Sequence, residues 1–247
     1  MLLDCSNSMT SSAFPDHPLS RKDVIAKGVA AGIFSLSGNP LQEFAYVLIL
    51  GFDHEIVTIL PYTSIQEIVS KFKDAQGLEL YLKEKMARKN GATDINGALD
   101  VAFRFTQQFI DGQIQALGDY KARIQSVIDD KMISHLIPNI RVLLFTDGYQ
   151  FLGDENDNRL LPSPFKNLQY NGRIFDLLMG AYYGGGAEDG FLQLKTLTSQ
   201  CPRHPSIDQL FLFDSPAKVA NLKGLFRMAS GASGFCPKCL EEAGAFS

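Results

Sequence analysis

Oxygen-bearing side chains gather in three short stretches of this chain. Asp4, Ser6 and Ser8 alternate directly after an apolar dipeptide, Thr93 stands in a loop before a helical pattern, and Asp147 follows a branched apolar run. Carboxylates and hydroxyls are hard ligands. A small set of them suits Mg²⁺, which takes octahedral geometry and keeps several waters. The residue types therefore predict a site for Mg²⁺ or Mn²⁺ built from Asp4, Ser6, Ser8, Thr93 and Asp147.

The order of these stretches resembles the metal-ion-dependent adhesion site of von Willebrand factor type A domains of the intracellular, bacterial type. The matching elements are Asp4-x-Ser6-x-Ser8, Gly91-x-Thr93-Asp94 and Thr146-Asp147-Gly148. The resemblance implies that the Ser6 and Ser8 hydroxyls bind the cation directly, and that Thr93 binds it directly or through water. It implies that Asp4 and Asp147 act mainly through bridging waters. One coordination position then stays open for a carboxylate of a partner protein.

These expectations favour an adaptor or scaffold that binds a protein partner over an enzyme with catalytic residues. Carboxylates that act partly through water leave the ion electrophilic enough to attract an outside Asp or Glu. The alternative is a Mg²⁺-dependent phosphohydrolase. Phosphatases with an aspartate nucleophile carry a second Asp two residues further on, and here Ser6 stands at that position.

A second metal pattern lies near the C-terminus. Cys236-Pro237-Lys238-Cys239 is half of a zinc signature, and Cys201-x-x-His204 could supply the other half. The competing interpretation is a pair of surface thiols with an unrelated Cys and His. A zinc-binding tail would give a third function, assembly or regulation through the metal. We expect residues 1–230 to form one domain and residues 231–247 a short cysteine-containing tail.

Apolar patterns that alternate between strands and helices predict the fold class. Two of the strand-like runs flank Asp53-His54, which indicates a hairpin, and Ser20 is a plausible N-cap for the first helix. The pattern predicts a doubly wound α/β fold with a mostly parallel sheet, helices on both faces, and ligands beyond the carboxyl ends of its strands. Strands are expected at 2–3, 44–52, 55–60, 139–145, 173–179 and 209–213, and helices from 21, over 64–76, from about 96, and over 120–136, 191–198 and 216–228.

Composition excludes several other classes. The chain has 247 residues, 45% of them hydrophobic, and a net charge of −4, so the basic footprint of a nucleic-acid binder is missing. Its longest apolar run, residues 44–52, is far shorter than the roughly 20 residues of a membrane span. Four cysteines are too few for a disulfide scaffold, and the first residues lack the pattern of a secretory signal. We therefore expect a cytoplasmic protein without nucleic-acid or membrane partners.

Overall fold

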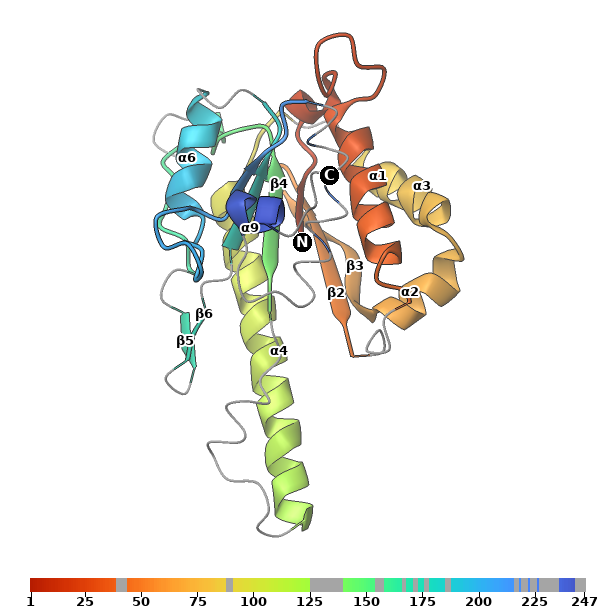
Figure 1. Ribbon diagram of the computed structural model, residues 1–247, viewed down its shortest axis with the longest axis vertical. Helices are drawn as coiled ribbons and strands as arrows, with labels where there is room; N and C mark the ends of the chain where they lie inside the picture. Colours follow the sequence, from red (N-terminus) through yellow and green to blue (C-terminus); the bar gives the residue numbers. More distant parts are fainter. Residues whose placement is uncertain are drawn as a thin grey trace.

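A six-stranded, mostly parallel sheet forms the centre of the molecule in the order β3-β2-β1-β4-β7-β8 (Figure 1). The computed structural model describes residues 1–38, 44–87, 91–124, 140–153, 158–165, 168–170, 173–175, 178–184, 188–215, 218, 222, 226 and 236–242. The strands of the sheet are β1 (Leu2–Asp4), β2 (Tyr46–Phe52), β3 (Ile56–Ser64), β4 (Val142–Thr146), β7 (Leu178–Tyr182) and β8 (Leu210–Leu212). The helices are α1 (Arg21–Phe34), α2 (Ile65–Phe72), α3 (Ala75–Met86), α4 (Ile95–Ile124), α6 (Asp189–Leu197), α9 (Pro237–Glu242) and the 3-10 helix η1 (Asn7–Thr10).

Strand pairing confirms the predicted α/β class. The edge strand β3 runs antiparallel to β2 through the predicted hairpin, and the other strands of this sheet pair in parallel. The strand expected at 173–179 is wrong as a single element. Its first part is β6 (Arg173–Phe175), which pairs with β5 (Leu168–Tyr170) in a separate two-stranded ribbon, and its last part belongs to β7.

The alternation of side chains along the strands divides the core into two layers. Leu3 and Phe145 pair in register and pack on one face with residues of α1 and α3. Leu2 and Leu144 pair in the same register and pack on the other face with residues of α4 and α6. Figure 1 shows these helices on opposite sides of the sheet, so the molecule is doubly wound as expected.

Polar residues at helix ends fix the helices that cover the first face. Ser20 caps α1 in a reciprocal capping box with Asp23, which confirms the predicted N-cap.

The helix expected over 64–76 is too long, because α2 ends at Phe72. Lys73 then takes a positive φ of 65°, and the N–H of Asp74 donates to the carbonyl of Phe72 at 2.8 Å. This tight turn separates α2 from α3, a helix that the sequence pattern did not predict.

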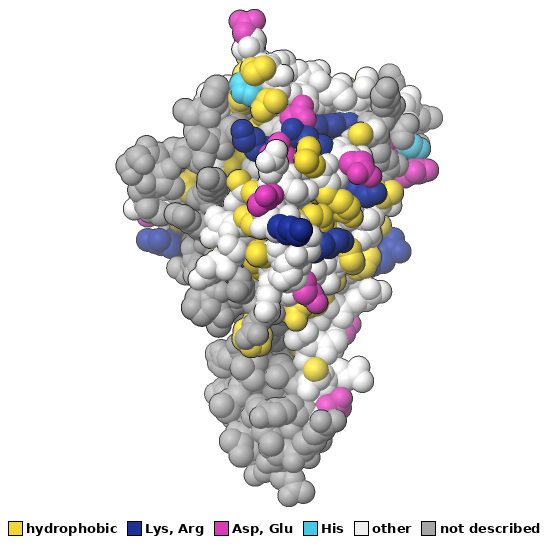
Figure 2. Space-filling view, turned by 90° about the vertical axis from the view of Figure 1, so that its right-hand side faces the viewer, with side chains coloured by type: hydrophobic (Ala, Val, Ile, Leu, Met, Phe, Trp, Pro, Cys, Tyr) yellow, Lys and Arg dark blue, Asp and Glu magenta, His cyan; other side chains and the backbone are white. Residues whose placement is uncertain are grey.

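Charged side chains cover the outside of the layer formed by α1 and α3. Lys83 on α3 pairs with Asp23 on α1 at 3.3 Å and with Glu79 on its own helix at 2.8 Å. Figure 2 shows this side of the molecule, where Lys and Arg side chains alternate with acidic ones. Neither sign of charge dominates the described part of this face.

The helix α4 extends well past the end of the sheet (Figure 1). It runs for 30 residues, and most of the described side chains in 111–119 are exposed. The separate helix expected over 120–136 is wrong at its start, because residues 120–124 continue α4; the rest lies outside the described residues.

Of the helix expected over 216–228, the structure describes Lys218, Leu222 and Phe226, and all three are helical. No helix in the described ranges combines the length and the apolarity that a bilayer crossing requires.

Candidate metal centres

The five residues predicted to hold Mg²⁺ come from the carboxyl ends of the central strands and the loops beside them. Asp4 is the last residue of β1, the strand between β2 and β4, and Asp147 directly follows β4. Ser6 precedes η1 and Ser8 lies within it. Thr93 stands two residues before α4. Parallel strands deliver their last residues to one edge of a sheet, so this topology brings the separate stretches together.

Hydrogen bonds connect four of these five residues. The hydroxyl oxygens of Ser6 and Ser8 are 3.0 Å apart, and the Ser8 hydroxyl donates to Oδ1 of Asp147 at 2.8 Å. Oδ1 of Asp4 accepts from the backbone N–H of Ser6 at 2.8 Å, and its Oδ2 accepts from the Thr146 hydroxyl at 2.6 Å. Asp4, Ser6 and Asp147 are buried, whereas Ser8 is exposed. The site is therefore enclosed by protein and opens to solvent on the Ser8 side.

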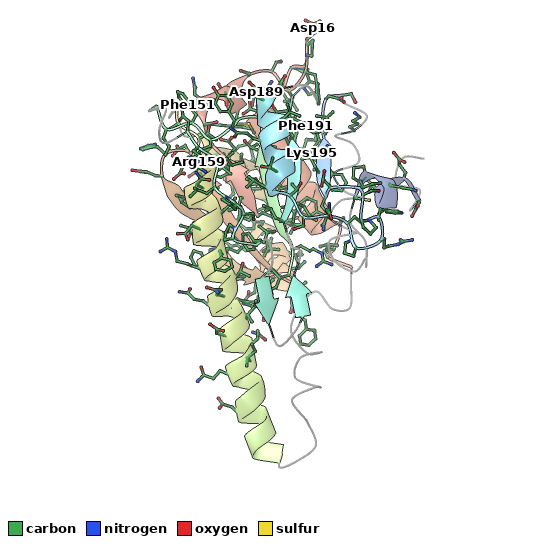
Figure 3. The ribbon with its side chains drawn as sticks, turned by 90° about the vertical axis from the view of Figure 1, so that its left-hand side faces the viewer. Asp16, Phe151, Arg159, Asp189, Phe191 and Lys195 are labelled. Atoms are coloured by element: carbon green, nitrogen blue, oxygen red, sulfur yellow. The ribbon has the colours of Figure 1, made fainter. Side chains whose placement is uncertain are left out.

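Thr93 reaches the same edge from the other side of Gly148. Its backbone forms an antiparallel bridge with Phe151, with N···O distances of 2.7 and 3.0 Å. A Cβ placed on Gly148 would lie 3.6 Å from the Thr93 hydroxyl and 3.9 Å from Oδ2 of Asp4. Both side chains thus lie close to one point. Figure 3 shows Phe151 and Arg159 beside the N-terminal end of α4.

A further carboxylate of this region, Asp94, acts as a helix cap. Its Oδ1 accepts the N–H of Gly97 at 2.9 Å and the amide Nε2 of Gln150 at 3.2 Å. Gln150 is itself buried, and its Oε1 accepts the N–H of Asn96 at 3.0 Å. These bonds fix the loop after β4 against the start of α4, which holds Thr93 in place.

Two buried carboxylates at one site impose an electrostatic cost. The pKa of Asp4 is raised to about 6, mainly by burial and to a smaller extent by repulsion from Asp147. Two basic residues of α1 offset part of this negative charge. Arg21 donates to Oδ2 of Asp147, and the ammonium of the buried Lys22 donates to the carbonyl of Cys5 at 2.7 Å. Burial lowers the pKa of Lys22, and attraction by Asp4 and Asp147 opposes that shift.

Sequence reasoning missed these two basic residues. They stand in the first turn of α1, where the positive end of the helix dipole disfavours cations. A pair of basic residues directly after an N-cap serine is therefore a detectable signal for acidic groups opposite that helix. Cys5, which lies between Asp4 and Ser6, faces away from the site: it packs in the core layer of α1, and its thiol donates to the carbonyl of Leu3.

A second cluster brings together the four residues that the zinc pattern singled out. The sulfurs of Cys201 and Cys239 are 3.6 Å apart, and those of Cys236 and Cys239 are 3.7 Å apart. Nδ1 of His204 lies 3.3 Å from the sulfurs of Cys236 and Cys239 and 4.0 Å from that of Cys201. All four ligand atoms lie within 4.8 Å of one another, so this cluster could hold a metal ion.

The environment of these thiols is unfavourable for free thiolates. All three cysteines are buried, and burial raises the pKa of Cys236 to about 12 and raises that of Cys239. Repulsion between neighbouring sulfurs adds to the shift. Thiolates here need a cation among them. The interpretation of the cysteines as surface thiols is wrong, because Cys236 and Cys239 are 0% and 2% exposed.

Comparison with known proteins gives no family assignment. No family model matches the chain, and no curated protein matches it. Among solved structures, the chain is similar to proximal thread matrix protein 1 from the mussel byssus, with 14% identity and a TM-score of 0.49 over 94% of this chain and 46% of that chain. A second crystal form of that protein matches with 13% identity, a TM-score of 0.45 and the same coverage. The chain spans less than half the length of that protein, and neither match indicates what this chain binds.

Proposed function

We propose that this chain is a von Willebrand factor type A domain that binds Mg²⁺, or Mn²⁺ in its place, through Asp4, Ser6, Ser8, Thr93 and Asp147. The cation would capture a carboxylate of a partner protein. One observation carries this proposal: the hydroxyl oxygens of Ser6 and Ser8, the two residues expected to bind the cation directly, are 3.0 Å apart, and the Ser8 hydroxyl donates to Oδ1 of Asp147 at 2.8 Å. Adjacent ligand oxygens of an octahedral Mg²⁺ are about 2.9 Å apart, given Mg–O distances of about 2.0–2.1 Å.

The remaining contacts suit a site that keeps one position for an outside ligand. Both oxygens of Asp4 already accept hydrogen bonds from Ser6 and Thr146, which supports a role for Asp4 through bridging water. Ser8 is exposed, so a ligand from outside would approach along its side. The neighbouring Tyr149 and Phe151 are 45% and 40% exposed and would contact apolar residues beside the partner's carboxylate.

Cation binding is the first test. Isothermal titration of the full chain with Mn²⁺ should show one site that Ser8→Ala weakens by at least about tenfold, since a directly bound oxygen is lost. Ser70→Ala is the matched control, because Ser70 is an exposed serine on α2 whose hydroxyl donates to the carbonyl of Gln66 in its own helix at 2.9 Å. Equal affinities for wild type and Ser8→Ala would refute the assigned ligand.

Partner capture is the second test. The immobilised chain should retain a protein partner in Mg²⁺ and release it in EDTA, and Asp4→Ala should retain none. Capture that persists unchanged in EDTA and in Asp4→Ala would exclude adhesion through the ion. Turnover of p-nitrophenyl phosphate that is lost in Asp147→Ala would instead support the phosphohydrolase alternative, which needs a nucleophile or base beside the metal.

A second function is favoured by the cysteine cluster. We propose that Cys201, His204, Cys236 and Cys239 bind Zn²⁺, because three sulfurs and one imidazole nitrogen form a donor set that zinc prefers and Mg²⁺ avoids. Metal analysis of the purified chain tests this proposal: zinc in a near-stoichiometric amount supports it, and its absence rejects it.

A further inference from the structure

We infer that the cysteine cluster is a closed structural zinc site that fastens the segment 236–242 to the loop after α6 within a single chain. This inference rests on the second proposed function and is independent of the Mg²⁺ site. It replaces zinc-mediated assembly between chains with an intramolecular clasp.

The geometry of the cluster fits tetrahedral zinc. Zn–S bonds of about 2.3 Å and Zn–N bonds of about 2.0–2.1 Å place tetrahedral ligands about 3.8 Å apart for two sulfurs and about 3.5 Å for sulfur and nitrogen. Two of the three sulfur–sulfur distances are 3.6 and 3.7 Å, the sulfur–nitrogen distances are 3.3, 3.3 and 4.0 Å, and all four ligand atoms lie within 4.8 Å of one another. A disulfide needs sulfurs about 2.05 Å apart and would leave one of three cysteines over.

Both halves of the site are prearranged by their own backbone. In the loop after α6, the N–H of Cys201 donates to the carbonyl of Ile207, and the N–H of His204 donates to the carbonyl of Cys201. In the C-terminal half, the N–H of Leu240 donates to the carbonyl of Cys236, the residue directly before α9. This bond forms the first turn of the helix and places Cys236 and Cys239 on the same side of it. Each half thus presents two ligands, and zinc would join the halves.

The imidazole of His204 is oriented by a carboxylate. Its Nε2 lies 3.2 Å from Oε1 of Glu242, the last residue of α9. A hydrogen bond from Nε2–H to this carboxylate leaves the lone pair on Nδ1, the atom that faces the sulfurs. Glu242 is therefore a positioning residue, and it ties the far end of α9 to the same loop.

Four protein ligands and their burial define a structural role. A catalytic zinc keeps a position for water or substrate, whereas four protein ligands close the coordination sphere. The three cysteines are at most 2% exposed, so a second chain has no route to them in this structure. A six-residue helix such as α9 is too short to be stable alone. Zinc would therefore stabilise it, together with Leu240, which is buried in the core layer of α1.

Zinc content and oligomeric state test the clasp directly. Native mass spectrometry of the full chain, purified without chelator, should show about one zinc per monomer, as four ligands from one chain require. Cys239→Ser should lose the zinc, whereas Cys5→Ser, the matched buried cysteine outside the cluster, should keep it. Asp4→Ala should also keep it, which separates failure of the clasp from failure of the Mg²⁺ site. A zinc-free wild type, or zinc confined to oligomers, would overturn the inference.

Two further measurements remain decisive if Cys239→Ser does not fold. Cobalt added to the zinc-stripped wild type should give the intense visible bands of tetrahedral Co²⁺ with thiolate charge transfer; their absence rejects the site. Hydrogen exchange of segment 236–242 should increase on zinc removal while exchange of β1 and β4 stays the same. Unchanged exchange in 236–242 rejects the clasp.

Glu242→Gln should weaken zinc binding by about 10- to 100-fold, and equal affinity would remove Glu242 from the site.

Discussion

Arg21 donates a hydrogen bond to Oδ2 of Asp147 while Oδ1 of the same carboxylate accepts one from Ser8. The guanidinium therefore shares Asp147 with the hydroxyl that we assign to the cation. The Asp147 side chain is fully buried, and Nε of Arg21 is buried without a partner among the described residues. A fixed positive charge thus lies beside the proposed position of a divalent ion.

Removal of this charge should strengthen cation binding. Arg21→Ala is expected to raise the affinity for Mn²⁺ by roughly five- to tenfold, because repulsion between the guanidinium and the ion is lost. Arg21→Lys keeps the charge and serves as the control, with an affinity near that of wild type. Isothermal titration at constant ionic strength measures both. An affinity for Arg21→Ala below that of wild type would show that Arg21 supports the ion instead.

The raised pKa of Asp4 predicts how stability depends on pH when no metal is bound. The pKa of Asp4 is about 6 in the folded chain, against an ordinary value of 3.8. The folded state therefore binds more protons between these values, and stability falls as pH rises from about 4 to about 6. Asp4→Asn should remove this loss and stabilise the metal-free chain at pH 8 by on the order of 2 kcal/mol relative to its effect at pH 4.

Urea unfolding in EDTA, followed by circular dichroism at both pH values, tests this expectation. Addition of Mg²⁺ at pH 8 should stabilise the wild type and leave Asp4→Asn nearly unchanged, because the ion neutralises the buried carboxylate. An Asp4→Asn effect that is equal at pH 4 and pH 8 would contradict the assignment of the raised pKa.

Close packing between α1 and the described residues of 216–228 predicts a sharp steric effect. A Cβ on Gly32 would lie 2.2 Å from the ring carbon Cδ2 of Phe226, which is buried. Gly32→Ala should destabilise the chain by about 1–3 kcal/mol through overpacking. Gly38→Ala is the control, since no atom of the residues that the structure describes lies within 4 Å of its Cβ position. Denaturant unfolding measures both. Phe226→Leu replaces the ring with a smaller side chain, so adding it to Gly32→Ala should recover part of the lost stability.

The turn between α2 and α3 stores strain that glycine would relieve. Lys73 has a φ of 65°, a conformation that side chains disfavour. Lys73→Gly should therefore stabilise the chain by about 0.5–1 kcal/mol, whereas Lys71→Gly, within the last turn of α2, should destabilise it by about as much. Urea midpoints compare the two. A destabilised Lys73→Gly would show that the Lys73 side chain contributes more than the turn costs.

The central sheet could be predicted because its strands are short apolar runs bounded by polar residues. Asp4 and Asp147 stand where such runs end, so their meeting at one edge follows from parallel pairing. The end of α2 could not be predicted, since Lys73 and Asp74 are ordinary helix-surface residues and the break depends on their backbone conformation. The boundary between β6 and β7 was missed because the residues from 174 to 179 are apolar except for Asp176, which gives no turn signal of its own.

The cysteine cluster shows where sequence reasoning ends. The pairs Cys201 with His204 and Cys236 with Cys239 are each visible as local spacing, but they are separated by at least 32 residues. Their contact depends on how the chain returns to the loop after α6, which local periodicity does not encode. The role of Arg21 was hidden in the same way, because its partner lies 126 residues away.

The three-residue length of β1 makes the molecule sensitive to insertion. Leu2, Leu3 and Asp4 point alternately to the α4 layer, the α1 layer and the open edge, and Cys5 returns to the α1 layer. One residue added before Leu2 would leave this order intact. One residue added between Leu3 and Asp4 would turn the side chains of Asp4 and Cys5 to the opposite faces. Asp4 would then move to the position of Cys5 in the apolar layer of α1, and Cys5 would move to the position of Ser6 at the site.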